Sequence, residues 1–215
     1  MEIRGFATGP YQTNCYLVYD ALDNKVTVID PGMHAAAKLV EFFDETGLEP
    51  EQIVLTHGHI DHTRDAGTLA ARYQVPVYIH PNDEFMLDAG DGVSEKSKIL
   101  FDAKNMTPIK DLRHLCDGEA LEIAGEQFVP RHAPGHSPGS TLLVGSEICF
   151  SGDVLFRGSI GRTDLVQSSP EDMQVTLRDV VLPLDDALQV LPGHGGTTTI
   201  RAERMTNPFL QAFRD

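Results

Sequence analysis

The chain has 215 residues, a formal net charge of −15, 41% hydrophobic residues and 23% charged residues. These proportions are ordinary for a globular protein, and no run approaches the roughly 18 apolar residues that a membrane span needs. We therefore expect no membrane association. The first residues also lack an apolar run before a cleavage site, so we expect no signal peptide. Lys and Arg form no cluster, which argues against nucleic acid as a partner.

The three cysteines, Cys15, Cys116 and Cys149, are odd in number and have no CxxC spacing. This usage indicates reduced, mostly buried thiols in a cytoplasmic protein. No repeat, low-complexity segment or linker divides the sequence. Residues 1–215 are therefore expected to form a single domain without a C-terminal helical domain.

The N-terminal half predicts an α/β layer. Hydrophobic periodicity and turn residues predict, in chain order, strands at 15–20 and 25–30, a helix at 35–46 that stops at Gly47, a strand at 53–56, a helix at 66–73 and a strand at 75–80. Strand, loop, helix and strand in succession favour an α/β layer. Residues 88–112 predict only a loop or a short helical insertion.

The C-terminal half repeats this pattern. The expected elements are strands at 127–132, 141–144 and 147–151, a helix at 170–182, a strand within LQVLPGHG and a helix from about Thr199. Ser169 is a plausible N-cap and Pro170 suits the first turn. The recurrence indicates two similar halves packed together.

The segment VLTHGHIDHTRDAG concentrates the chemistry. Residues two apart on an extended segment point the same way, so His57 and His59 can share one site, while Asp61 and His62 turn toward a second. Such a loop could merely form hydrogen bonds. Four ligand-type groups within six residues after an apolar strand instead favour two divalent metals, with zinc most suited and iron or manganese feasible.

Three further residues of ligand type lie in Gly-rich or strand-end settings. They are His136 in APGHSPGST, Asp153 in FSGDVLF and His194 in VLPGHGG. With the first four, they make seven ligands, enough for two sites of three with one shared carboxylate.

In this order and spacing, HGHIDH, PGHSPG, SGD and PGHG resemble the metallo-β-lactamase superfamily over essentially the whole chain. The resemblance implies an αββα sandwich of the α/β class, with outer helices and the metals at one edge. It assigns His57, His59 and His136 to the first metal. It assigns Asp61, His62 and His194 to the second, with Asp153 bridging. Asp61 and Asp153 would be the catalytic carboxylates.

Within the superfamily, the glyoxalase II group (hydroxyacylglutathione hydrolases) is the most similar branch. The similarity lies in GDVLF at 152–156, the loop SIGRTD at 159–164 and the tail at 201–211. It implies cleavage of a small-molecule thioester such as S-lactoylglutathione by a hydroxide held by the metals, in a monomer or small homo-oligomer. Arg162 would bind the substrate. Asp164 stands where the group has an aromatic residue, which leaves the thiol carrier open.

Other readings of the same residues remain. A persulfide dioxygenase would hold one iron on two histidines and one aspartate: His57 or one of its neighbours, together with His136 and Asp153. The loop of those enzymes also reads GRTD, although Ile160 stands here in place of their cysteine. A lactonase or a non-catalytic binding module would share the fold. True β-lactamases place Cys or Ser at the position of Asp153 or His62.

Seven residue assignments are less specific. Asp30, in VIDPG, predicts either a partner that orients a metal-bound histidine or a turn residue before Pro31. Thr163 and Asp164 are expected to stabilise their loop. The remaining histidines are expected to be structural or exposed, namely His34, His80, His114 and His132.

Overall fold

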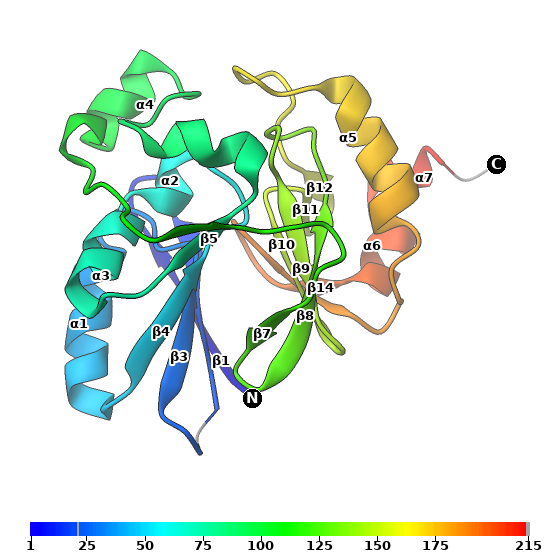
Figure 1. The fold of residues 1–215 in the computed structure, drawn as a ribbon. Helices are drawn as coiled ribbons and strands as arrows, with labels where there is room; N and C mark the ends of the chain where they lie inside the picture. The colour runs from blue at the N-terminus through cyan, green and yellow to red at the C-terminus, as the bar shows by residue number, and fades with distance from the viewer. Residues whose placement is uncertain (21, 214–215) are drawn as a thin grey trace.

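The structure is a computed structural model that describes residues 1–20 and 22–213, and these residues form two six-stranded sheets. The sheets pack face to face, and helices cover the outer face of each (Figure 1). The expected αββα sandwich is confirmed.

The first sheet is mixed. Its strand order is β1 (Glu2–Thr8), β2 (Thr13–Tyr19), β3 (Lys25–Ile29), β4 (Glu49–Val54), β5 (Val77–Ile79) and β6 (Leu112–His114). Strands β1 to β3 are antiparallel neighbours, and β3 to β6 are parallel. Parallel neighbours need crossover connections, and helices α1 (Ala35–Thr46) and α3 (Ala66–Tyr73) provide two of them. The carboxyl ends of β3 and β4 therefore lie at the same edge.

The second sheet has mostly antiparallel neighbours. Its strand order is β14 (Thr198–Thr199), β13 (Gln189–Pro192), β10 (Ile148–Gly152), β9 (Thr141–Val144), β8 (Glu126–His132) and β7 (Leu121–Ile123). Within this second sheet, as far as the structure describes it, only the central strands β10 and β13 are parallel neighbours. The chain between them contains α5 (Pro170–Thr176), continued by the π-helical turn η3 (Leu177–Val181), and α6 (Ile200–Thr206) follows β14.

Shorter elements complete the fold. They are α2 (Ile60–Thr63), the 3₁₀ helices η1 (Pro81–Leu87) and η2 (Ala103–Asn105), α4 (Glu95–Leu100), the hairpin β11 (Leu155–Phe156) and β12 (Ser159–Ile160), and α7 (Pro208–Gln211) near the C-terminus.

Side-chain alternation along β2 shows how the layers are held together. Cys15 and Leu17 pack with the helices of the first outer layer, whereas Tyr16 and Val18 face the second sheet. The Tyr16 ring lies 5.3 Å from the ring of Phe150 on β10. Burial of apolar surface on both faces of the strand therefore joins both sheets and a helical layer.

The predicted elements are largely confirmed. The helices at 35–46 and 66–73 and the strand at 141–144 have the expected bounds, and Ser169 caps α5 by accepting a hydrogen bond from the Asp172 amide. The segment 88–112 contains the short helix α4. Cys15 and Cys149 are buried free thiols, whereas Cys116 is exposed.

Several elements were not predicted. Strand β1 contains Gly5, and its side chains do not alternate regularly between buried and exposed. It forms because it pairs with β2 along its whole length. Strands β6 and β7 have three residues each, too few to display a period. Strand β4 begins at Glu49, earlier than expected, because its polar start pairs in parallel with β3. The C-terminal helix is divided, since Asn207 and Pro208 begin α7.

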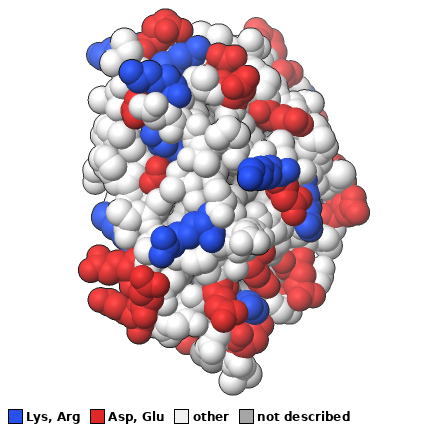
Figure 2. Space-filling view, turned by 60° about the vertical axis from the view of Figure 1, so that its left-hand side comes forward, with Lys and Arg blue, Asp and Glu red and all other residues white. Residues whose placement is uncertain are grey.

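Among the helices that the structure describes, none is long and apolar enough to cross a membrane. On the face drawn in Figure 2, Lys and Arg form small separate groups with Asp and Glu among them. The charge on this face is therefore mixed.

Two histidines outside the sequence motifs stack on each other. His80 follows β5 and His132 ends β8, and their rings are 4.0 Å apart and nearly parallel, at 3°. His80 accepts a hydrogen bond from the Asn82 amide. Burial, with a smaller contribution from His132, lowers the pKa of His80 to about 4. The stack joins the two sheets, because β5 belongs to the first and β8 to the second.

This stack predicts a pH-dependent stability. An unfolded His takes up its proton near pH 6.5, so between pH 6.5 and about 4 the unfolded chain binds more protons than the folded one. Stability should fall as the pH falls through this window, by about 1 kcal/mol for this partly exposed ring. Denaturant unfolding of metal-free wild type and His80→Gln should diverge there. His34→Asn, at an exposed ring, should keep the wild-type slope, and parallel profiles for wild type and His80→Gln would contradict the prediction.

Candidate metal centre

Four loops from both sheets meet at one edge of the sandwich. The loop after β4 carries His57 and His59, and α2 continues it. The other ligand-type residues are Asp61 and His62 on α2, His136 between β8 and β9, Asp153 directly after β10 and His194 after β13. The structure therefore brings together all seven residues that the sequence singles out.

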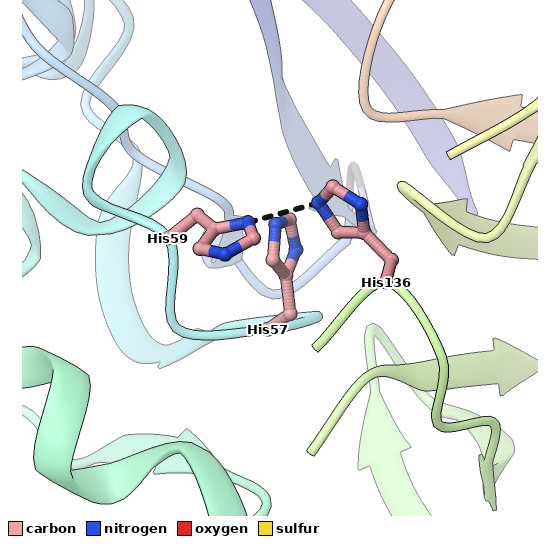
Figure 3. Close-up of side chains that lie close together, drawn as sticks. All are labelled: His57, His59 and His136. Carbon is pink, nitrogen blue, oxygen red and sulfur yellow. Dashed lines mark hydrogen bonds between the residues drawn. The ribbon is translucent and has the colours of Figure 1, made fainter. Parts of the chain in front are cut away.

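The first set consists of His57, His59 and His136 (Figure 3). One ring nitrogen of each lies within 4.8 Å of the others. The closest pair is His59 Nδ1 and His136 Nε2, at 2.9 Å. Figure 3 shows the three rings converging from two separate loops. This spacing suits three nitrogen ligands around one ion.

The second set consists of Asp61, His62 and His194. His194 Nε2 is 3.2 Å from Asp61 Oδ2, and His62 Nε2 is 3.5 Å from the same oxygen. The two ring nitrogens are 3.4 Å apart. One carboxylate oxygen and two imidazole nitrogens therefore point at a common position.

Asp153 lies between the two sets. Its Oδ2 is 3.4 Å from His136 Nε2 and 3.4 Å from His194 Nε2, one residue from each set. Its Oδ1 is 3.3 Å from His62 Nε2. A carboxylate in this position can reach ions in both sets.

Burial and neighbouring charge separate the protonation states of these groups. Burial lowers the pKa of His57 well below its usual value and, together with His136, that of His59 to about 3, so both rings are neutral. Burial alone would raise the pKa of Asp153, but His62 and His194 outweigh it and hold that pKa well below its usual value. Neutral imidazoles and ionised carboxylates are the ligand forms that divalent metals require.

Hydrogen bonding also fits a bound metal. Within the described part of the chain, His57 Nε2 and Asp153 Oδ1 are buried without a hydrogen-bond partner. Buried polar atoms are normally paired, so unpaired ones in such a cluster need another partner. Nitrogen and carboxylate donors suit zinc, iron or manganese.

Contacts on the far side of each ring fix its orientation. Asp30 Oδ2 lies 2.9 Å from His62 Nδ1, and Asp30 also accepts hydrogen bonds from the amide and hydroxyl of Thr56. Asp30 therefore makes the contact with a histidine of the predicted metal site that the first interpretation expects, and its positive φ of 51° is that of a turn residue, as the second expects. Fixing Nδ1 leaves Nε2 of His62 for the cluster.

Backbone carbonyls orient two other rings, and a hydroxyl orients a carboxylate. His136 Nδ1 is 2.9 Å from the Arg162 carbonyl, and His194 Nδ1 is 3.1 Å from the Tyr11 carbonyl. Thr13 donates to Asp61 Oδ2 at 2.9 Å. Sequence reasoning missed Tyr11 and Thr13, because nothing in TGPYQTN indicates a contact with residues 48 to 183 positions away.

A cavity of about 770 Å³ opens onto the cluster. Its wall is partly apolar, with Tyr11, Phe156, Ile160, Leu165 and Val166, and it includes Asp61, Asp153 and His194. Among the described residues that line it, Arg162 is the only Lys or Arg. The exposed Arg162 guanidinium pairs with Asp164 of the same loop through two contacts of 2.8 and 2.9 Å. The histidines expected to be structural or exposed lie outside the cluster.

Comparison with known proteins agrees with this geometry. The profile of the Metallo-beta-lactamase superfamily matches residues 8–194, so the chain belongs to this superfamily. It is 33% identical over 225 residues to hydroxyacylglutathione hydrolase GloC of Haemophilus influenzae, covering 99% of each chain.

Two solved structures are also similar. BLEG-1 B3 metallo-beta-lactamase superposes with a TM-score of 0.85 at 35% identity, over 97% of this chain and 99% of its own. TTHA1623 in a di-iron-bound form superposes with a TM-score of 0.81 at 36% identity, over 96% and 100%. These likenesses leave the substrate and the native metal to be tested.

Asp30→Asn separates the two roles of Asp30. Asn tolerates a positive φ and keeps the turn bond from the Gly32 amide to the carbonyl of residue 30. Its amide can no longer accept every bond of the carboxylate, so the orientation of His62 should be lost. We expect metal affinity to fall about 10- to 100-fold, measured by chelator competition. Unchanged metal affinity would show that Asp30 acts only as a turn residue.

Proposed function

We propose that the protein is a binuclear metallohydrolase that cleaves a small-molecule thioester. The observation that carries the proposal is the arrangement of two ligand sets joined by Asp153 beside a partly apolar cavity with one arginine. Divalent metals in such a site supply Lewis acidity and lower the pKa of water from 15.7 to about 7, which makes a nucleophile available at neutral pH.

The residues of the chain provide the remaining requirements. Asp153 is ionised and touches both sets, so it would keep two cations at a fixed separation. The apolar wall around Phe156 and Leu165 would hold the acyl-thiol chain and limit the access of water. The likeness to a hydroxyacylglutathione hydrolase supports a thioester as the scissile group.

Arg162 is proposed to bind an anionic part of the substrate. Its guanidinium lines the cavity, while its backbone carbonyl holds the ring of His136. Asp164 already occupies this guanidinium, so a carboxylate on the substrate must compete with Asp164. A thiol carrier with fewer carboxylates than glutathione would suit this site better.

Metal content and activity test the proposal together. Purified protein should contain about two metals per chain and hydrolyse thioesters, with S-lactoylglutathione and thioesters of other small thiols as substrates. Chelation should abolish hydrolysis, and returning zinc, iron or manganese in separate samples should identify the active metal. Asp153→Asn, which keeps the shape of the side chain, should lose bound metal and activity.

Three results would contradict this function. One iron per chain with oxygen uptake on glutathione persulfide would indicate a dioxygenase. Faster cleavage of a β-lactam or a lactone than of any thioester would assign another hydrolase. Full metal occupancy without any hydrolysis would favour a binding module.

A second prediction concerns Arg162. Arg162→Ala should raise KM about tenfold for thioesters whose thiol carries a carboxylate, because a charge-assisted hydrogen bond is lost, with little change in kcat. Asp164→Asn should lower KM for the same substrates by freeing the guanidinium. Arg178→Ala is the matched control, since Arg178 is also exposed and paired with a neighbouring Asp, but lies outside the cavity. An equal KM for wild type and Arg162→Ala would show that Arg162 does not bind the substrate.

A further inference from the structure

A fully buried carboxylate connects the two loops that carry the first ligand set. Asp83, on η1 after β5, is 0% exposed. Its Oδ2 accepts hydrogen bonds from the Gly58 amide at 2.8 Å and the Ser137 hydroxyl at 2.6 Å, and its Oδ1 accepts one from the Gly139 amide. All three donors lie in the loops that carry the predicted ligands.

These donors alternate with ligands along the sequence. Gly58 lies between His57 and His59, and Ser137 directly follows His136. Asp83 thus holds the Gly58 amide, between His57 and His59, and the Ser137 hydroxyl, next to His136. The two loops are otherwise about 80 residues apart in sequence.

Close packing explains two glycines of the motifs. A Cβ on Gly58 would lie 2.8 Å from the Asp83 carbonyl oxygen, and a Cβ on Gly139 would lie 2.7 Å from Asp83 Cγ. Any side chain at either position would push the Asp83 segment away from the loops. The glycines in HGH and SPG therefore admit this carboxylate.

The second ligand set is held by other contacts. Thr13 on β2 donates to Asp61, and Asp30 after β3 holds His62. Both contacts come from the first sheet rather than from η1. Asp30 also accepts hydrogen bonds from Thr56, whose hydroxyl lies 3.2 Å from His57 Nδ1, so Asp30 contacts both sets. Of these three supports, Thr13 contacts only the second set, and Asp83 contacts only residues beside the first.

We propose that Asp83 is a positioning residue for the set His57, His59 and His136, and that the cation affinity of this set depends on it while that of the other set does not. This inference rests on the metal sites of the proposed function, but it does not depend on the thioester reaction.

Asp83→Asn tests the inference with minimal change in shape. Each carboxylate oxygen faces one glycine amide, so in either orientation the Asn NH₂ group meets an N–H donor and one loop is released. In zinc titrations against a chelator, His136→Ala and His194→Ala first identify which bound equivalent belongs to which set. Asp83→Asn should then weaken the His136-dependent equivalent about 10- to 100-fold and change the other by less than about twofold.

Two variants serve as controls. Glu203 is also a buried carboxylate that accepts hydrogen bonds from three groups. They are the backbone N–H of Gly158, the hydroxyl of Thr198 and the side-chain NH₂ of Asn207, and none of them is next to a ligand. Glu203→Gln should lower stability without changing either zinc affinity. Thr13→Val should show the reverse selectivity and weaken only the His194-dependent equivalent.

The outcomes are decisive in both directions. Equal weakening of both equivalents by Asp83→Asn, no weakening of either, or the same loss in Glu203→Gln would overturn the inference. If Asp83→Asn does not fold, Ser137→Ala removes one of the three donors and should still weaken the His136-dependent equivalent selectively. If Asp83→Asn weakens zinc binding only at the His136-dependent site, but the wild-type protein cleaves no thioester, the role of Asp83 stands and the proposed reaction is rejected.

Discussion

Three buried carboxylates surround the single imidazole of His62. Asp30 faces its Nδ1, while Asp61 and Asp153 face its Nε2 at 3.5 and 3.3 Å. Burial disfavours a charge on this ring, but the carboxylates outweigh burial and raise the pKa of His62 well above its usual value. Concentrating this much negative charge away from water is costly unless positive charge compensates it. The arrangement of the whole edge follows from this requirement, because it must deliver the compensating groups from four loops.

In the sandwich, the packed strands and the loops at their ends contribute differently to this arrangement. The inter-sheet core around Phe128, Phe150 and Leu191 holds the two sheets together and thereby fixes where the strand ends lie. The loops then need only short extensions to reach the cluster, where hydrogen bonds to neighbouring elements hold them, and Asp83 of η1 holds two of these loops. Rigid strands supply position, and polar contacts in the loops supply orientation.

Much of this architecture could be predicted from the sequence, for identifiable reasons. The helix at 35–46 has a regular apolar face and a glycine stop, so local pattern and final structure agree. The ligand-type residues stand out because imidazoles and carboxylates are rarely placed together in Gly-rich loops without a chemical reason. The two-residue strands of the hairpin at 155–160 offer no periodicity, and they form through local pairing.

The supports of the cluster could not be predicted in the same way. Thr13 and Asp83 are common residue types in unremarkable surroundings, and their partners lie 25 to 56 residues away. Only the register of the first sheet and the path of η1 bring them to the cluster. Asp30 was the exception, because its position before Pro31 and Gly32 at a strand end suggested both a turn and a partner for histidine.

The order of the ligands along the chain has a consequence for biosynthesis. His194 belongs to the second set and its ring is held by the Tyr11 carbonyl, so this half of the cluster unites segments 183 residues apart. A ribosome releases the N-terminal segments first. The carboxylates of the cluster are therefore synthesised before the last imidazole, and the complete cluster can assemble only after residue 194 has emerged.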